Sequence, residues 1–472
     1  MRTGLLFAAA ALALSACTVG PDYHGPAPVA SSPNWVEPAA AGAVDTRWWQ
    51  GFGDPVLSDL VTRALAKSPD LKEAGARLAE ARANLDAARG GRLPTVTAKG
   101  SATENRYSEN GALPVGNIPG FPLEYSLFDL GFDASWELDF WGRHTREIQG
   151  AVARVGSAEE ARHDVVMTLI SEIARNYVEL RGAQADAATA RANAAAAADL
   201  ARLTALRFRQ GEAARQDADS AESAARAAAA AVPQAEANAA GSAYRIAVLV
   251  GEPPEQVVPA LLAGAPIPAG PDAVAAGLRS ELLERRPDVR KAERELAAAT
   301  ADIGVATADL FPRFSLLGSI GMQAQAVGDL VDSGSIRYQV GPSFSWPIFA
   351  GGTIRAHIRA TDARADAAAA RYEKAVLGAL SDSEAAINRF AHAGTTLKAA
   401  EDALARQRGA YAMIQARTAR GEDDRLTLAR AQQAVVSAEQ ARDRAAAAKC
   451  EAAVALYKAL GGGWDVAETT AQ

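Results

Sequence analysis

Hydrophobic and polar residues alternate with a period of two in four segments of the chain. The longest is residues 126–143, SLFDLGFDASWELDFWGR, in which every second residue from Phe128 to Phe140 is apolar. The other three segments are residues 95–103, 314–325 and 336–348. A period of two predicts β-strands that have one apolar face and one polar face.

A long segment rich in Ala and Arg follows each pair of predicted strands. Residues 142–209 and 352–420 predict helices that are each about 100 Å long if unbroken, at a rise of 1.5 Å per residue. Proline is favourable in a first helical turn, and glycine is a common helix stop. Four further helices are therefore expected: Pro69–Arg89, Pro287–Ala308, and two that run from turns at Gly211 and Gly421 to Gly251 and Gly461.

The two halves of the chain share one plan. Trp136 and Trp346 occupy equivalent positions at an offset of 210 residues, and the same offset relates Gly142 to Gly352. The second half lacks eight residues in 312–341, between two predicted strands, where a hairpin loop tolerates a deletion. The pattern indicates that the chain is a duplication.

The N-terminus has the pattern of an export signal. Arg2 precedes an apolar run of 12 residues, Leu5–Ala16, which is shorter than the about 20 residues that span a bilayer and fits a secretory signal peptide. Leu14–Cys17 resembles the lipobox of bacterial lipoproteins, so we expect a covalent lipid on Cys17. Ordinary signal cleavage beside a chance cysteine is the alternative. Thr18 follows in place of the Asp that retains such lipoproteins in the inner membrane, which favours the outer membrane.

The signal and the repeats divide the chain into six expected parts. These are a signal peptide (1–16), a lipidated tether and equatorial segment (17–67), a first repeat (68–251), a Pro-rich linker and equatorial segment (252–285), a second repeat (286–461) and a C-terminal tail (462–472). With Cys17 lipidated, the other cysteine, Cys450, has no partner within the chain for a disulfide. We interpret Cys450 as a small helix residue among alanines.

Two isolated strand pairs cannot close a membrane barrel, because closed barrels need eight or more strands. Unpaired strand edges are costly in lipid, so several copies must join: two would supply eight strands and three would supply twelve. A soluble β-sandwich is the alternative for the strands. Alanines at spacings of three and four, from Ala431 to Ala459 and from Ala221 to Ala235, predict closely packed helices. A fibrous coiled coil is the alternative for the helices.

Charge and candidate chemistry exclude several function classes. The net charge of −7 and the absence of a basic stripe with aromatics argue against nucleic-acid binding. The five histidines are scattered without metal-ligand spacing, and no Walker or GxGxxG sequence follows a strand. We therefore expect no enzyme, no metal and no cofactor apart from the lipid on Cys17.

Five motifs are spread over nearly the whole mature chain: VGPDY (19–23), RWWQGFGDP (47–55), ELLERRPDVR (281–290), FPRFSL (311–316) and GPSFSWPIFAGG (341–352). Together they resemble the outer-membrane factors, the TolC-like exit ducts, in their lipoprotein, NodT-type branch. The resemblance implies a mainly α fold with a β membrane part. It implies a homotrimer with four barrel strands per protomer, a 12-stranded β-barrel in the outer membrane and a long periplasmic α-helical coiled-coil barrel.

The resemblance also implies a function. Such ducts conduct small molecules passively to the exterior, and receive them from an inner-membrane pump, usually of the resistance–nodulation–division class, through a periplasmic adaptor. A duct for type I protein secretion is the nearest alternative, and a non-channel periplasmic scaffold lipoprotein is a further one. The polar positions Lys99, Asp133, Glu137 and Arg337 carry both signs of charge, so they indicate no charge preference for the substrate.

In this family, the adaptor docks and the gate closes at the helix turns farthest from the membrane. The motif Arg-x-x-x-Gly that marks these turns occurs here twice, as Arg207 with Gly211 and as Arg417 with Gly421. Asp217 lies beside the first of them. By resemblance, these residues form the docking site and the gate.

The second of these turns departs from well-known members of the branch. Thr418 and Arg430 stand where those members have Tyr and Asp. We hypothesise that Asp423 and Asp424 supply the carboxylate ring of the gate instead. The alternative is that both are solvated turn residues.

Overall fold

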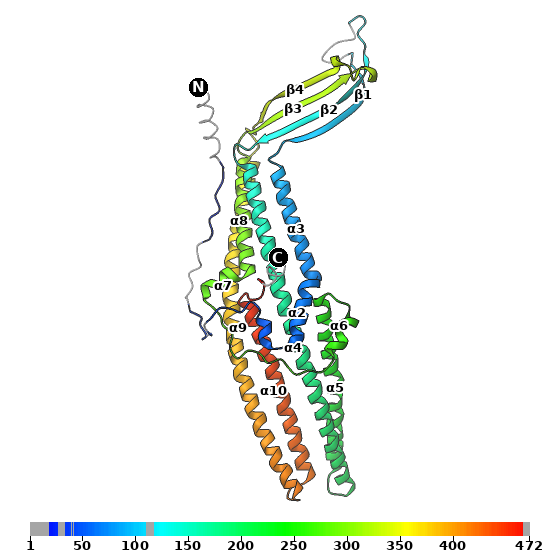
Figure 1. Cartoon of the computed structure of the whole chain (residues 1–472), viewed down its shortest axis with the longest axis vertical. Helices are drawn as coiled ribbons and strands as arrows, with labels where there is room; N and C mark the ends of the chain where they lie inside the picture. Colours follow the sequence, from blue (N-terminus) through cyan, green and yellow to red (C-terminus); the bar gives the residue numbers. More distant parts are fainter. Residues whose placement is uncertain (1–17, 27–33, 39, 41, 110–117, 466–472) are drawn as a thin grey trace. The chain divides into compact units, whose positions relative to one another are not determined.

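The structure is a computed structural model that describes residues 18–26, 34–38, 40, 42–109 and 118–465 (Figure 1). The chain divides into two compact units, and each unit contains segments of both repeats. The sheet unit comprises Met1–Pro26, Ala79–Ser157 and Glu293–Arg371. The helical unit comprises Ala27–Leu78, Ala158–Ala292 and Tyr372–Gln472.

The sheet unit contains four antiparallel strands in the order of the sequence. They are β1 (Thr95–Arg106), β2 (Glu124–Leu138), β3 (Arg313–Ala324) and β4 (Ile336–Ser345). The pairing of β2 with β3 joins the two repeats in one sheet, and β1 and β4 lie at its edges (Figure 1). The connection between β3 and β4 is shorter than that between β1 and β2, which agrees with the deletion in the second repeat.

The register places apolar and polar residues on opposite faces of the sheet. Phe132 pairs with Ala98 on one side and with Ile320 on the other, so even-numbered residues of all four strands share one face. This apolar face is open in the single chain: Phe132 is 58% exposed and Tyr338 is 79% exposed. The odd-numbered residues form the polar face, which includes Lys99, Asp129, Asp133, Glu137, Ser319, Gln323, Arg337 and Gln339. The two-faced strands predicted from the sequence are confirmed.

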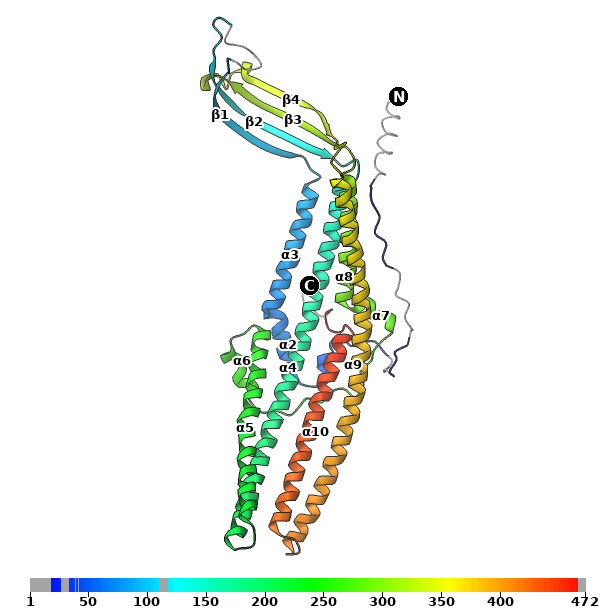
Figure 2. The same ribbon diagram turned by 180° about the vertical axis from the view of Figure 1, so that it is seen from behind.

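The helices predicted from the repeats are confirmed within about a residue at their ends, except that the two helices after the turns at Gly211 and Gly421 begin only at Arg215 and Arg425. They are α3 (Pro69–Gly90), α4 (Arg143–Arg209), α5 (Arg215–Val250), α8 (Pro287–Ala308), α9 (Thr353–Ala419) and α10 (Arg425–Ala459). The equivalent helices α4 and α9 each have 67 residues, as a duplication predicts. In the helical unit, α5 lies beside α4 and α10 lies beside α9 (Figures 1 and 2). No helix in the described ranges has the length and apolar character needed to cross a membrane.

Six short elements of the described residues were not predicted individually. They are the 3-10 helices η2 (Trp48–Phe52), η4 (Val327–Asp329) and η5 (Ser333–Ser335) and the helices α2 (Pro55–Lys67), α6 (Pro254–Leu261) and α7 (Arg279–Arg285). The start of α2 has a local explanation, because the Asp54 carboxylate accepts hydrogen bonds from the amides of Val56 and Leu57. In addition, Pro55 occupies the first turn, where its missing N–H is no loss. Short helices of this kind lack the periodic length that identifies the long ones.

The main hydrophobic core lies in the helical unit. Trp48 is almost fully buried and stacks on Tyr457 of α10, with ring centroids 5.0 Å apart. Ile173 of α4 and Ile246 of α5 are fully buried in the same core. The aromatic residues of the segment RWWQGFGDP therefore contribute to packing, which stabilises the chain through buried apolar area.

Candidate functional site

The polar face of the sheet is concave at Gly131 and Gly321. These glycines pair directly across β2 and β3. A Cβ atom added to Gly131 would lie 2.7 Å from the carbonyl oxygen of Ile320, and one added to Gly321 would lie 2.6 Å from that of Leu130. A side chain at either of these two positions would therefore collide with the backbone of the neighbouring strand. The backbones of β2 and β3 thus approach each other closely on this face. Glycine at such a position lets a sheet bend as a closed barrel requires.

Charged side chains on the concave face form specific pairs. The Lys99 Nζ lies 2.7 Å from Asp133 Oδ2. The Arg337 guanidinium donates to both carboxylate oxygens of Asp129, at 2.9 and 2.6 Å. Glu137 lies near the end of β2, 3.9 Å from Nε2 of His144. The sequence placed these charges on one face, and the structure decides which of them meet.

The two Arg-x-x-x-Gly motifs form the same backbone turn, which we call the first turn (210–214) and the second turn (420–424). In the first, the Glu212 amide donates to the carbonyl of Arg207 at 2.8 Å and the Gly211 amide donates to that of Phe208 at 2.9 Å. This pair of hydrogen bonds forms a Schellman motif, which needs a residue with a left-handed backbone conformation directly after the helix. Gly211 supplies it, with φ of 80°.

The second turn repeats this geometry. The Glu422 amide donates to the carbonyl of Arg417, and the Gly421 amide donates to that of Thr418, both at 3.0 Å. Gly421 has φ of 76°. The spacing of Arg and Gly is therefore that of a helix stop, and the motif has a structural meaning independent of any gate.

The arginine of each motif contacts an acidic residue of the turn that follows it. The Arg417 Nε lies 3.0 Å from Asp423 Oδ2. The Arg207 Nε lies 3.8 Å from Glu212 Oε2. Asp217 accepts a hydrogen bond of 3.3 Å from the amide of Ala214 at the start of α5. Each turn thus combines a Schellman stop with acidic residues that balance its arginine.

Asp424 is the N-cap of α10. Its carboxylate accepts a 2.7 Å hydrogen bond from the amide of Thr427. Hydrogen bonds from the Thr427 side chain and backbone hold the pKa of Asp424 below its ordinary value, and the positive charges of Arg207 and Arg430 lower that pKa further. The equivalent residue of the first turn is Ala214, which provides no side-chain cap. The carboxylate-ring hypothesis for Asp423 and Asp424 stays a prediction, but both side chains already have partners in the single chain.

A buried arginine that the sequence did not single out binds the N-terminal segment through hydrogen bonds. Arg146 of α4 is 3% exposed. It donates from Nε to the carbonyl oxygen of Val19 and from Nη2 to that of Gly20, both at 3.1 Å. Its Nη2 also lies 2.8 Å from Asp22 Oδ1. Gly20 crosses so close to Gly304 of α8 that a Cβ on Gly20 would lie 2.5 Å from the Gly304 Cα.

Residues 18–23, which contain the motif VGPDY, form a segment that we call the N-terminal strap. The strap ends with Tyr23, whose hydroxyl donates to Glu293 at 3.0 Å. Its start is also tied, because the Val19 amide donates to the carbonyl of Trp141, immediately before α4. Cys17, the expected lipid site, lies outside the described residues. The residues of the motif VGPDY fix the strap against α4 and α8.

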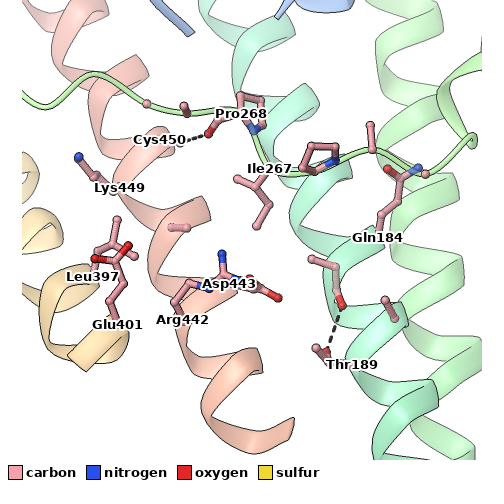
Figure 3. A pocket seen from close by; sticks show the side chains of 18 residues that line it. Gln184, Thr189, Ile267, Pro268, Leu397, Glu401, Arg442, Asp443, Lys449 and Cys450 are labelled. Carbon is pink, nitrogen blue, oxygen red and sulfur yellow. Dashed lines mark hydrogen bonds and ion pairs between the residues drawn. The ribbon is translucent and has the colours of Figure 1, made fainter. Parts of the chain in front are cut away.

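The helical unit contains a cavity of about 820 Å³, lined by residues of α4, α9, α10 and the linker between the repeats (Figure 3). Its charged lining is largely neutralised by pairs, because Arg442 contacts Asp443 at 3.1 Å and Lys449 contacts Asp272 at 2.8 Å. Cys450 donates to the carbonyl of Pro268, and burial raises the pKa of its thiol. Among the described residues, no group of His, Cys, Asp and Glu could hold a metal ion.

Comparisons with known proteins agree on one family. A family model described as outer membrane efflux protein matches residues 60–252 and 278–462. The pyoverdine export outer membrane protein OpmQ of Pseudomonas aeruginosa is 31% identical over 461 residues, which cover 96% of each chain. Nodulation protein T of Rhizobium leguminosarum bv. trifolii is 32% identical over 391 residues, or 82% of each chain. The solved outer-membrane channel OprN is 36% identical, with a TM-score of 0.84 over 95% of this chain and all of that one.

Proposed function

Because the chain belongs to the outer membrane efflux protein family, we propose that it works as a homotrimer that receives small molecules from a periplasmic adaptor and an inner-membrane pump. The protein is an exit duct of the outer membrane that extends into the periplasm. Its relatives are duct proteins rather than enzymes.

The curved, two-faced sheet carries the proposal for the membrane part. Its apolar face suits lipid and its concave polar face suits an aqueous passage. In the described part of the chain, β1 and β4 each pair on one side only. Four strands cannot close, and open edges are costly in lipid, so β4 of one copy must pair with β1 of the next. Three copies would supply the twelve strands expected from the family resemblance.

Tryptophans lie at the helix end of the sheet, as in the interfacial girdles of membrane barrels. At the helix end, the indoles of Trp136, Trp141 and Trp346 each donate to a backbone carbonyl, at 2.8 to 3.0 Å. An amphipathic ring with one apolar and one hydrogen-bonded side fits the boundary between lipid and water.

The N-terminal strap supports the proposed lipid anchor. The strap starts at the junction between β2 and α4, where Val19 is bonded to Trp141. Because consecutive Cα atoms are about 3.8 Å apart, a lipid on Cys17 would begin close to the aromatic girdle formed by Trp136, Trp141 and Trp346. Acyl chains attached there would enter the membrane at the level where the strands begin.

The two helix turns support the proposed adaptor contact. They have equivalent Schellman geometry, so the two repeats present similar turns to a partner. Their exposed charges include Arg420, which contacts Glu422 at 2.8 Å. The exposed alanines of the helices, such as Ala224 and Ala231, leave room for close approach of neighbouring copies.

Photocrosslinking in the producing organism tests the partners. A photoreactive residue at Arg420 probes the second turn, and the same residue at Tyr244, which is exposed on α5 away from the turn, is the control. We expect capture from position 420 of an adaptor together with a pump of the resistance–nodulation–division class. Capture of an ATP-driven transporter would support the protein-secretion alternative. Capture of no adaptor from position 420 would refute the tripartite assignment of the turn.

Native mass spectrometry of the protein extracted in detergent tests the number of copies. We expect a complex of three chains, each carrying the mass of a lipid on Cys17. A dimer, or a mature chain without lipid, would contradict the corresponding part of the proposal.

A further inference from the structure

One row of residues crosses all four strands on the concave face. The register pairs Lys99 with Gly131, Gly131 with Gly321, and Gly321 with Arg337. The row therefore has a cation at each edge strand and two glycines between them. The glycines leave no side chains in the middle of the row, so the cations can extend along the surface of the sheet.

Two carboxylates of β2 lie on either side of this row. Asp129 is two residues before Gly131 and Asp133 is two residues after it, so all three share the concave face. Arg337 reaches from β4 over Gly321 of β3 to bond Asp129 of β2. Lys99 of β1, which pairs with Gly131, contacts Asp133 on the other side of that glycine in β2.

The two pairs differ in how firmly they are held. Asp129 accepts two hydrogen bonds from Arg337 and a third, of 2.9 Å, from Gln323. Its side chain is only 17% exposed. The Lys99 side chain is 68% exposed and makes one contact with Asp133, whose side chain is 40% exposed. A planar guanidinium that binds a carboxylate at two points is more rigid than a single ammonium contact.

We propose that this row and its two flanking carboxylates form a charge-balanced band of the duct interior, in which Lys99 and Asp133 cancel each other and so keep the passage from preferring anions or cations. The inference rests on the proposed function, because the concave face must line an aqueous passage. In a trimer, the band contains three copies of each pair. The Arg337–Asp129 pair is the more firmly held of the two. It links β4 of the second repeat to β2 of the first repeat and stabilises the curved sheet. The solutes on which the band acts are small ions and charged small molecules.

The physical reason is charge balance. With both partners present, each Lys99–Asp133 pair is neutral and attracts neither ion strongly. Removal of one partner leaves three like charges facing the water of the passage. A unit charge a few ångströms from an ion in water changes its local concentration by about two- to fivefold, and screening reduces this effect as salt rises.

Reversal potentials in planar bilayers under a gradient of KCl test the proposal. In Asp133→Asn, we expect the ratio of anion to cation permeability to rise by about two- to fivefold, and in Lys99→Gln to fall by a similar factor. The double variant should return close to the unmodified ratio. Both single effects should shrink in about 1 M salt, where the screening length is about 3 Å.

The control is Glu222→Gln, which removes one exposed carboxylate from an ion pair with Arg226 on α5, a helix of the helical unit. It should leave the permeability ratio unchanged. Heat resistance of the trimer on SDS gels checks assembly of every variant. We expect Asp129→Asn to lower this resistance and to change the permeability ratio less than Asp133→Asn does.

The outcomes separate the two proposals. A channel whose permeability ratio is the same in Lys99→Gln, Asp133→Asn and the unmodified protein refutes the band but leaves the duct intact. The same refutation follows if both single variants shift the ratio in one direction. An unmodified, correctly assembled protein without any conductance refutes the proposed passage itself, and with it the band.

Discussion

Replacement of Asp424 by Ala and by Asn separates its role as a helix cap from its hypothesised role in the gate. The Asn side chain keeps an oxygen that accepts from the Thr427 amide, whereas Ala removes the acceptor. Loss of an N-cap costs about 1 kcal/mol, which corresponds to about fivefold more frequent opening of the first turn of α10. Asp424→Ala should therefore speed hydrogen exchange of the α10 first-turn amides about fivefold, and Asp424→Asn should change it little.

Resting conductance in planar bilayers provides the second measurement. If Asp424 acts through its charge in a carboxylate ring, both variants should raise the conductance equally. If it acts as a cap, only Asp424→Ala should do so. Equal hydrogen exchange in the two variants would refute the capping argument.

The pH dependence of the same exchange gives an independent check. Because the pKa of Asp424 is lowered from 3.8 in the folded protein, the stabilisation by its carboxylate is complete above about that pH. It is lost as the pH falls through the lower value of the folded state. Exchange in the first turn of α10 should thus accelerate in acid for the unmodified protein. The Asp424→Asn variant should lack this acid response.

Three further variants test separate parts of the structure. Arg146→Gln removes the charged group that donates to the N-terminal strap. The loss of about 2 kcal/mol should speed hydrogen exchange of the strap amides by one to two orders of magnitude. The control Arg154→Gln, which breaks an exposed ion pair of the same helix, should leave the strap protected. Gly421→Ala forces a left-handed backbone on a residue with a Cβ and should destabilise the chain by about 1 kcal/mol. Gly409→Ala, in open space within α9, should instead stabilise the chain slightly. Thermal unfolding in detergent compares the two variants. Cys450 should resist maleimide at pH 8 in the folded protein, because burial raises the pKa of its thiol, and should react after unfolding; rapid labelling of the folded chain would contradict the packed arrangement.

The elements that depend on local sequence were predictable. Alternation with a period of two identifies strands because side chains of a strand point to opposite faces at every step. Likewise, Gly211 and Gly421 mark helix ends because each needs a positive φ that is easy only for glycine. The cap at Asp424 was within reach of the same reasoning, since an Asp three residues before Thr427 precedes a helical pattern.

The contacts between distant segments were not predictable in this way. The sequence shows that Asp129 and Arg337 belong to polar faces, but their meeting depends on the register of three strands from two repeats. The importance of Gly131 likewise emerges only when Gly321 lies opposite it.

The grip of Arg146 on the N-terminal strap has the same origin. No periodicity in α4 distinguishes this arginine from the many others of the helix, because its partners are backbone carbonyls 126 and 127 residues away. The sequence by itself therefore determined the elements, the repeat and the two faces of the sheet, all of which follow from the spacing of residues along one strand or helix. The tertiary structure alone decided which charges pair and where the sheet bends, because these depend on which strands and helices lie side by side.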